Sequence, residues 1–478
     1  MRRVRAFAVL LAGSFLPAPG LAQDVPSFEE KACRRPLPGA RCGTLTVWED
    51  RDAARGRTLD LSVLVLEATG PEPRPDPIYV LTGGPGSAAT GSAGGWVQSP
   101  FRADRDIVMM DQRGTGESNV LLCLHPDDAP VDVFLGPLFD TGLLEQCIPE
   151  LETRADLTKY QSPYSLDDLD DLREALGHHR VNLWGVSYGT RAALVYIRRH
   201  EAHVRSAILE ASMSMSQIMP DGMARDAEAA IRGVIEDCMG MPDCAAKYPN
   251  LEADYAAAVA GVQEPVAVRI PDPRTRDTVR ATLRREGFAE ALRAMLYNPG
   301  ATRDIPRLLH MAATAGDYDG FAAFGAARAY GIAHAAATGM YLSVTCAEDI
   351  PFADEAGEYE QGAGTFLADA RARAHHDSCR IWPRGRVSPD FHENVVSDVP
   401  VLILNGTHDP VTPPRWGEAA AGGLSNAIRV VVPFGHHGWG GLENADGCVT
   451  AIQREFLAAP PGAPDTSCLS TIRRRPFN

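Results

Sequence analysis

A serine set between glycines is the residue of this sequence best suited to nucleophilic attack. Gly185-Val186-Ser187-Tyr188-Gly189 follows the short apolar run 181–184, and apolar residues then recur at helical spacing. The pattern predicts a strand, a sharp turn and a helix, with the Ser187 hydroxyl pushed clear of the sheet. Glycines on both sides of the serine let the strand and the helix approach closely. Because the chain holds 44 glycines, such a pentapeptide also arises by chance, so its interpretation depends on the rest of the chain.

A serine nucleophile needs an adjacent base, and that base needs a carboxylate to orient it. Asp409 comes just after the apolar run 399–404, and a pair of histidines comes just after the run 428–432. The order serine, acid, histidine, with each residue behind a predicted strand, is the order expected of an α/β-hydrolase. We therefore predict that Ser187, Asp409 and His437 form a catalytic triad.

The histidine of this set has to be chosen from two neighbours, His436 and His437. Gly438 follows His437 directly, so the run P-F-G-H-H-G aligns with the P-x-x-G-H-G pattern usual at this position, with His436 in place of a glycine. This alignment favours His437 as the base. The alternative for either residue is an ordinary surface or core histidine.

Backbone N–H donors must also be in place for the oxyanion of the tetrahedral intermediate. Tyr188, directly after the nucleophile, supplies one predicted donor. The second is predicted in the run Thr82-Gly83-Gly84-Pro85-Gly86, which follows the apolar run 78–81. Gly84 is the expected donor there, because Pro85 has no N–H.

Short apolar strands that alternate with helices predict an α/β fold with a mostly parallel central sheet. Alternation stops at Met213 and resumes at Val399, and Ala-rich helical segments fill the interval. We therefore expect an α/β-hydrolase fold with a large helical cap inserted after the sixth strand. The expected parts are a signal peptide (1–22), the first part of the core (23–212), a mainly helical cap (213–398) and the second part of the core (399–478).

The N-terminus has the pattern of a secretory signal. Three arginines precede an apolar stretch, 6–16, that is too short to span a bilayer, and small residues at 20–22 follow it. We expect an exported protein, periplasmic or extracellular, without a membrane anchor. A net charge of −16 argues against a nucleic-acid or anionic-membrane partner, and the short cluster 473–475 of arginines is expected to be a solvated tail. No sequence signature of a metal site or a cofactor is present, so none is predicted.

Ten cysteines, an even number, predict disulfides in a chain bound for an oxidising compartment. The simplest pairing joins neighbours along the sequence, although spacing alone does not establish it. These pairs are Cys33–Cys42, Cys123–Cys147, Cys238–Cys244, Cys346–Cys379 and Cys448–Cys468.

Five motifs, in order, together resemble the prolyl aminopeptidase and tripeptidyl aminopeptidase group of α/β-hydrolases. They cover most of the mature chain and read T-G-G-P-G (82–86), D-Q-R-G-T-G-E-S (111–118), G-V-S-Y-G-T (185–190), G-T-H-D-P-V-T-P (406–413) and G-H-H-G (435–438). The chain looks most similar to the secreted tripeptidyl-aminopeptidase branch, which has a large helical cap and a TAP-like C-terminal segment. One departure is Thr82, where the family usually has histidine, and this difference puts substrate preference in doubt.

The resemblance implies a serine exopeptidase that acts on peptide substrates with a free N-terminus. Such enzymes hold the substrate α-ammonium group with carboxylates near the cap, since a buried cation needs a paired anion. The candidates are Glu210, Glu348 and Asp349, each of which is alternatively a solvated surface acid. A secreted carboxylesterase or lactonase with the same triad is the competing interpretation, and a non-catalytic binding protein of the same fold is disfavoured because all three triad residues are present. Residue preference, the number of residues released and the oligomeric state stay open.

Overall fold

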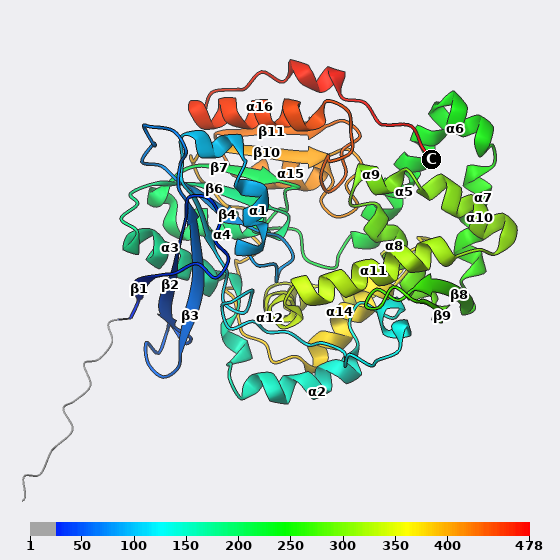
Figure 1. The fold of residues 1–478 in the computed structure, drawn as a ribbon, viewed down its shortest axis with the longest axis horizontal. Helices are drawn as coiled ribbons and strands as arrows, with labels where there is room; N and C mark the ends of the chain where they lie inside the picture. Colours follow the sequence, from blue (N-terminus) through cyan, green and yellow to red (C-terminus); the bar gives the residue numbers. More distant parts are fainter. Residues whose placement is uncertain (1–24) are drawn as a thin grey trace, which may run out of the picture.

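The computed structural model describes residues 25–478, so the predicted signal peptide lies outside the described residues (Figure 1). A nine-stranded sheet forms the centre of the fold, in the order β1-β2-β3-β5-β4-β6-β7-β10-β11. The first three strands are antiparallel, and β5, β4, β6, β7, β10 and β11 run parallel. The strands are β1 (Ser27–Lys31), β2 (Ala40–Trp48), β3 (Thr58–Leu66), β4 (Ile78–Leu81), β5 (Ile107–Met110), β6 (Val181–Val186), β7 (Val204–Glu210), β10 (Val401–Gly406) and β11 (Ala427–Val432).

Helices cover both faces of this sheet, as its parallel strands require. Alternate residues of each strand face opposite ways, so Leu183 and Leu209 pack with the cluster that includes α4, whereas Trp184 and Ile208 pack toward α16. The helices outside the insertion are α1 (Ala93–Trp96), α2 (Thr141–Glu152), α3 (Ser162–Ala175), α4 (Tyr188–His200), α15 (Pro414–Ala421) and α16 (Ala445–Ala458). Single 3-10 turns are η1 (Thr90–Ser92), η2 (Pro100–Ala103), η3 (Val131–Leu135), η4 (Leu157–Lys159), η5 (Glu201–His203), η6 (Ile350–Phe352) and η7 (Ser467–Thr471).

Helix α3 begins one turn earlier than its apolar pattern predicts. Ser165, a residue type that caps helices, predicts the start of the helix, but the helix starts at Ser162, with Pro163 in its first turn. Ser165 is buried inside the helix, and Ser162 instead meets Glu348 from the insertion. A tertiary contact thus decides where this helix starts.

The insertion between β7 and β10 is built mainly from helices. It follows β7, the seventh strand of the chain and not the sixth, and the N-terminal strands β1 and β2 were not revealed by the sequence pattern. One antiparallel hairpin accompanies the helices. The elements are α5 (Met223–Gly240), α6 (Pro242–Lys247), α7 (Leu251–Gly261), β8 (Val266–Pro271), β9 (Thr278–Leu283), α8 (Arg285–Met295), α9 (Pro299–Thr302), α10 (Ile305–Ala315), α11 (Asp319–Ala335), α12 (Thr338–Glu348), α13 (Glu355–Gly362) and α14 (Ala370–Ile381).

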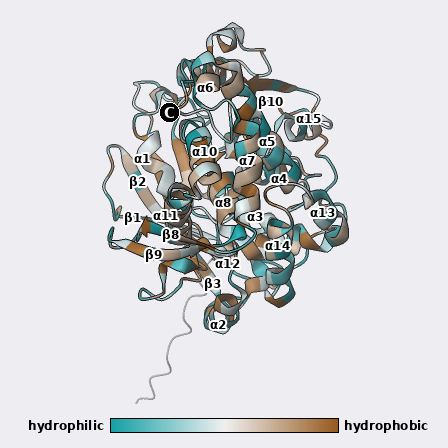
Figure 2. Cartoon of the chain, turned by 90° about the vertical axis from the view of Figure 1, so that its right-hand side faces the viewer, coloured by the Kyte–Doolittle hydropathy of each residue, from teal (hydrophilic) through white to brown (hydrophobic). Residues whose placement is uncertain are grey.

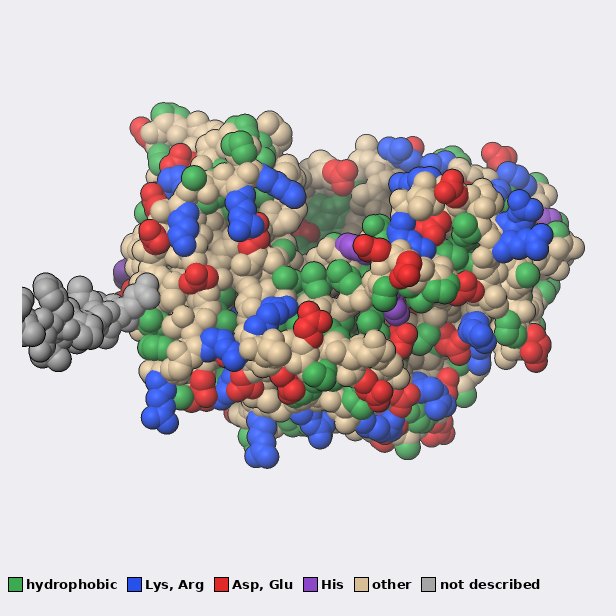
Figure 3. All heavy atoms as spheres, turned by 60° about the horizontal axis from the view of Figure 1, so that its bottom comes forward, with side chains coloured by type: hydrophobic (Ala, Val, Ile, Leu, Met, Phe, Trp, Pro, Cys, Tyr) green, Lys and Arg blue, Asp and Glu red, His purple; other side chains and the backbone are tan. Residues whose placement is uncertain are grey.

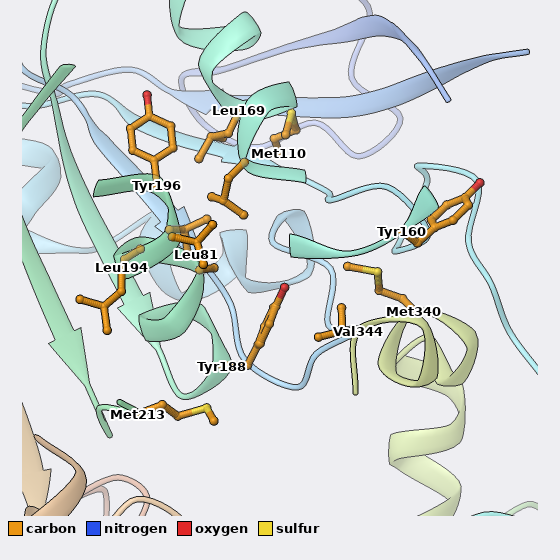
Figure 4. Packing of buried hydrophobic residues seen from close by; sticks show 14 of the residues in the cluster. Leu81, Met110, Tyr160, Leu169, Tyr188, Leu194, Tyr196, Met213, Met340 and Val344 are labelled. Atoms are coloured by element: carbon orange, nitrogen blue, oxygen red, sulfur yellow. The ribbon is translucent and has the colours of Figure 1, made fainter. Parts of the chain in front are cut away.

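The insertion has its own hydrophobic core but is joined to the sheet. Helices α5, α7, α8 and α10 gather on one side of the molecule and carry both hydrophilic and hydrophobic residues (Figure 2). Turn η3, from the segment before α3, packs against α11 and β9, so this segment also belongs to the packing of the insertion. Figure 4 shows Tyr188 of α4 lying between the sheet side of the core and Met340 and Val344 of α12. The cap and the nucleophile helix therefore share one buried cluster.

All five predicted disulfides are confirmed, and the ten cysteines, all within the described residues, are paired. The expectation for the C-terminal arginines is wrong for Arg474, which is buried. Its guanidinium donates to Asp237 of α5 (2.7 Å) and to Thr302 of α9 (2.8 Å), so the C-terminal segment is fastened to the insertion (Figure 1). Among the described residues, no helix combines the length and the apolar character that crossing a bilayer requires.

Candidate active site

Ser187 occupies a strained turn between β6 and α4. Its backbone has φ 58° and ψ −125°, a conformation that non-glycine residues rarely adopt. A Cβ on Gly185 would lie 2.4 Å from the carbonyl oxygen of Gly189, and one on Gly189 would lie 2.0 Å from that of Leu81. Both flanking glycines are therefore required by the close approach of β6, α4 and the end of β4. The turn places the serine at the carboxyl edge of the sheet.

His437 lies between Ser187 and Asp409, although these residues come from three separate strand ends. Its Nε2 is 2.8 Å from the Ser187 hydroxyl oxygen, and its Nδ1 is 3.0 Å from each carboxylate oxygen of Asp409. The Asp409 side chain is sealed from solvent, whereas the His437 side chain is 9% exposed. In this geometry the imidazole can take the serine proton while the carboxylate fixes its orientation.

Asp409 is held ready to act as an anion. Burial opposes its charge, but His437 and hydrogen bonds from Thr412 outweigh burial and lower the pKa of Asp409 below its ordinary value. The backbone N–H groups of Val411 and Thr412 donate to Oδ1 at 2.8 and 2.9 Å, and the Thr412 hydroxyl donates to Oδ2 at 2.8 Å. Asp409 is therefore ionised and fixed in one orientation.

His436 points away from the nucleophile. It is fully buried, with Nδ1 2.7 Å from the carbonyl oxygen of Leu296 and Nε2 3.1 Å from a guanidinium nitrogen of Arg474. Burial, reinforced by the positive charge of Arg474, lowers the pKa of His436 well below its usual value. His436 is thus a neutral link between the sheet edge, the insertion and the C-terminal segment.

The glycine loop after β4 lies directly beside the nucleophile. A Cβ on Gly83 would lie 2.9 Å from that of Ser187, and Gly84 has φ +115°, where a side chain would be strained. Thr82, which replaces the usual histidine, donates its hydroxyl to the carbonyl oxygen of Ser87 (2.8 Å) and so closes the loop. Tyr188 is the first residue of α4, so its N–H has no acceptor within the helix.

Glu210, the first of the predicted amine-binding acids, ends strand β7 next to the nucleophile turn. Its backbone carbonyl accepts from the N–H of Ser187 at 2.9 Å, and its half-buried side chain accepts a hydrogen bond from Gln453 of α16. Burial raises the pKa of Glu210 to about 7, although hydrogen bonds from Gln453 and Trp184 oppose the shift. The carboxyl group therefore titrates near neutral pH.

Glu348 and Asp349, the other two predicted acids, are fully buried and bound to the chain's own groups. The hydroxyl of Ser162 donates to Glu348 at 3.0 Å, and burial raises the pKa of Glu348 to about 7. Asp349 accepts from Arg191 at 2.9 and 3.1 Å and from the N–H of Met219 at 3.1 Å. Neither carboxylate is open to a substrate ammonium group in this structure, which corrects the expectation that places both at the substrate.

The insertion contributes a residue to the site that sequence reasoning missed. Tyr297, just after α8, packs edge-on against the imidazole of His437, with 4.9 Å between the ring centroids. No motif marks this tyrosine, because its place depends on how the insertion folds over the sheet.

The molecular surface is hollowed on one face, with hydrophobic side chains on the floor and charged side chains along the rim (Figure 3).

Among the described residues, Asp170, His200 and His203 bring three potential metal ligands within reach of one ion. Sequence spacing did not reveal this group, which lies on α3, at the end of α4 and in η5. Arg173 and Tyr196 already donate to the Asp170 carboxylate, both at 2.7 Å. The positive charge of Arg173 opposes the binding of a second cation there. We therefore interpret the group as part of an ion-pair network.

Comparison with known proteins identifies the family of the chain. A family model described as the α/β hydrolase fold matches residues 76–238, and one described as TAP-like protein matches residues 365–468. The chain belongs to the TAP-like α/β-hydrolases. The TAP-like match starts before the predicted core boundary at residue 399, so it includes α14 of the insertion.

Several curated relatives of this TAP-like hydrolase are similar at modest identity. Serine protease Hip1 of Mycobacterium tuberculosis is 25% identical over 459 residues, covering 86% of this chain and 84% of Hip1. The tripeptidyl aminopeptidase of Streptomyces lividans is 28% identical over 195 residues, covering 37% of this chain and 36% of that protein. A Mycobacterium tuberculosis protein named carboxylesterase B is 24% identical over 479 residues, covering 86% of this chain and 87% of that protein.

Among solved structures, a thermophilic esterase from Thermogutta terrifontis aligns with a TM-score of 0.36 and 15% identity, covering 84% of this chain and 94% of that one. The family and the curated relatives support a serine hydrolase.

Proposed function

We propose that the protein is a secreted serine exopeptidase that hydrolyses peptide bonds near free N-termini, of the tripeptidyl or prolyl aminopeptidase type. The observation that carries the proposal is the line of contacts from Asp409 through His437 to Ser187. Relatives named serine protease and tripeptidyl aminopeptidase support the peptide substrate. Five disulfides and the predicted signal peptide support export to the periplasm or the extracellular space.

In the proposed mechanism, the Ser187 oxygen attacks the peptide carbonyl carbon while His437 takes its proton. The N–H groups of Gly84 and Tyr188 receive the developing oxyanion, aided by the positive end of helix α4. His437 then returns the proton to the leaving amine, so that the C–N bond breaks and an acyl-enzyme remains. A water molecule, deprotonated by His437, hydrolyses this ester and restores Ser187.

For the substrate α-ammonium group, Glu210 stays the proposed partner. It is the one predicted acid that keeps partial exposure, and it adjoins the nucleophile through the backbone. Glu210→Gln is expected to raise KM for free-amine substrates about ten-fold and to leave N-acetylated substrates unaffected. An equal effect on both substrate sets would remove Glu210 from this role.

The test of the function is hydrolysis of chromogenic amides by the purified mature protein. Pro-, Ala- and Ala-Ala-Pro-type conjugates are offered free and N-acetylated, beside a short-chain ester, and Ser187→Ala serves as the blank. Cleavage of free-amine conjugates without their acetylated partners supports the exopeptidase and gives the number of residues released. Turnover of the ester alone contradicts it.

The second candidate is a secreted carboxylesterase or lactonase with the same triad. The specific observation in its favour is the 24% identity to carboxylesterase B over 86% of this chain. An esterase needs the same nucleophile, base and oxyanion donors but no partner for an amine, so equal rates on acetylated and free substrates would favour it.

A further inference from the structure

One buried arginine of the insertion has no partner in the part of the chain that the structure describes. Arg293 of α8 is only 3% exposed, yet no carboxylate pairs with it and no acceptor meets its guanidinium nitrogens. The Nε atom is sealed from solvent, whereas the two terminal nitrogens, which also have no acceptor, are not sealed. Buried arginines are normally paired, because an uncompensated charge is costly to take out of water. An anion from outside the chain would supply the missing partner.

The groups around Arg293 do not cancel its charge. Arg371 is neutralised by Glu290, with nitrogen–oxygen distances of 2.6 and 2.7 Å. His375 is neutral, since burial and the neighbouring arginines lower its pKa to about 3, and burial raises the pKa of Tyr341 to about 12.

Asp349, a buried acid of the same insertion, is already paired with Arg191. Among residues 25–478, Arg293 therefore has no carboxylate partner.

This charge lies close to the proposed catalytic residues. The guanidinium carbon of Arg293 is 5.2 Å from the ring centroid of Tyr297, an arrangement in which the aromatic face helps to hold the cation. The Tyr297 ring packs on His437, whose Nε2 is 2.8 Å from the Ser187 oxygen. A single aromatic side chain thus separates the free cation from the general base.

We propose that Arg293 binds a carboxylate group of the substrate and so makes the enzyme selective for peptides that carry an anion near the cleaved bond. Two sources have this chemistry: an Asp or Glu side chain, and the free C-terminal carboxylate of a short peptide. The planar guanidinium suits either, because it can donate two parallel hydrogen bonds to a carboxylate. The proposal rests on the proposed peptidase function and adds the substrate class.

The experiment uses the full mature enzyme and pairs of substrates that differ in one charge. Free-amine tripeptidyl p-nitroanilides carry Glu or Gln at each position in turn, and unlabelled tetrapeptides end in a carboxylate or an amide. We expect kcat/KM to favour the anionic partner at least ten-fold in one of the two sets, which identifies the source. Arg293→Gln is expected to abolish this preference.

Two further variants separate charge from folding. Arg293→Lys keeps the cation and is expected to retain part of the preference, and Arg307→Gln, at an exposed arginine of α10 paired with Asp304, is expected to retain all of it. Inhibition by glutarate compared with glutaramide, measured on whichever amide or ester the wild type cleaves, tests the anion site without a peptide. We expect glutarate to inhibit more strongly in the wild type and equally with glutaramide in Arg293→Gln.

The outcomes distinguish the two proposals. A wild type that cleaves only esters contradicts the exopeptidase, and the dicarboxylate comparison then still decides the role of Arg293. A wild type that cleaves peptides with no carboxylate preference, or an Arg293→Gln enzyme that keeps one, overturns the anion site alone.

Discussion

The carboxyl edge of the sheet and the junction between the core and the insertion both bury ionisable side chains. At the sheet edge, the chain of contacts from Asp409 ends at the Ser187 hydroxyl, beside a histidine that is 9% exposed. At the junction, Arg191 and Asp349 are both inaccessible to solvent and form a salt bridge with each other. The same kinds of side chain thus serve catalysis where the last group stays open, and cohesion where two opposite charges pair with each other.

Replacing the open base should have the largest effect. His437→Gln is expected to lower kcat about 10⁵- to 10⁶-fold, because Ser187 then has no proton acceptor. His436→Gln, one residue away, is expected to change kcat less than ten-fold, because His436 contacts Leu296 and Arg474 and not the nucleophile. Steady-state kinetics on the best amide or ester substrate measure both, and similar losses in the two variants would contradict the assignment of the base.

Removing the orienting charge comes next. Asp409→Asn is expected to lower kcat about 10⁴-fold with little change in KM, because an amide favours the wrong tautomer of His437. The thermal midpoint should stay close to that of the wild type, since the amide oxygen can still accept from Thr412. A variant with near-normal kcat would show that the carboxylate is dispensable.

Breaking the buried salt bridge between Arg191 and Asp349 should lower the stability of the protein. Asp349→Ala leaves the Arg191 guanidinium buried without its anion, so we expect a loss of about 3–5 kcal/mol in the free energy of unfolding. Glu418→Ala, at the exposed pair with Arg429, is the matched control and should cause little change. Urea unfolding followed by circular dichroism measures both variants, and equal stabilities would contradict the cohesive role of the junction.

The smallest effect concerns pH. Burial raises the pKa of Glu348 from 4.5 to about 7, so the folded state holds its proton more tightly than the unfolded state. The contribution of this group to stability is present below pH 4.5 and is lost as the pH rises through 7, by about 3 kcal/mol at most. Glu348→Gln keeps the neutral form at every pH. The stability of the wild type relative to this variant should therefore fall between pH 5 and pH 8, and a constant difference in unfolding experiments would contradict the shift.

Much of the sheet edge was predictable from local sequence. A strand, a glycine-flanked serine and a helix lie within a few residues, so the turn at Ser187 follows from short-range constraints. Asp409 and the histidine pair were likewise predicted from their places behind apolar runs, and Gly438 favoured His437 over His436. Sequence-near pairing also predicted the five disulfides correctly, because each short loop brings its cysteines together.

Tertiary structure alone decided which charged residues are open and which are satisfied. Sequence patterns do not distinguish Glu348 and Asp349 from acids that face a substrate. In the structure, Glu348 accepts a hydrogen bond from Ser162, and Asp349 forms a salt bridge with Arg191. Sequence patterns also do not reveal that Arg474 is buried, or that Arg293 is buried and unpaired. The physical reason is that pairing depends on partners far away in the chain, and helical periodicity fixes only which face of its own helix a residue occupies.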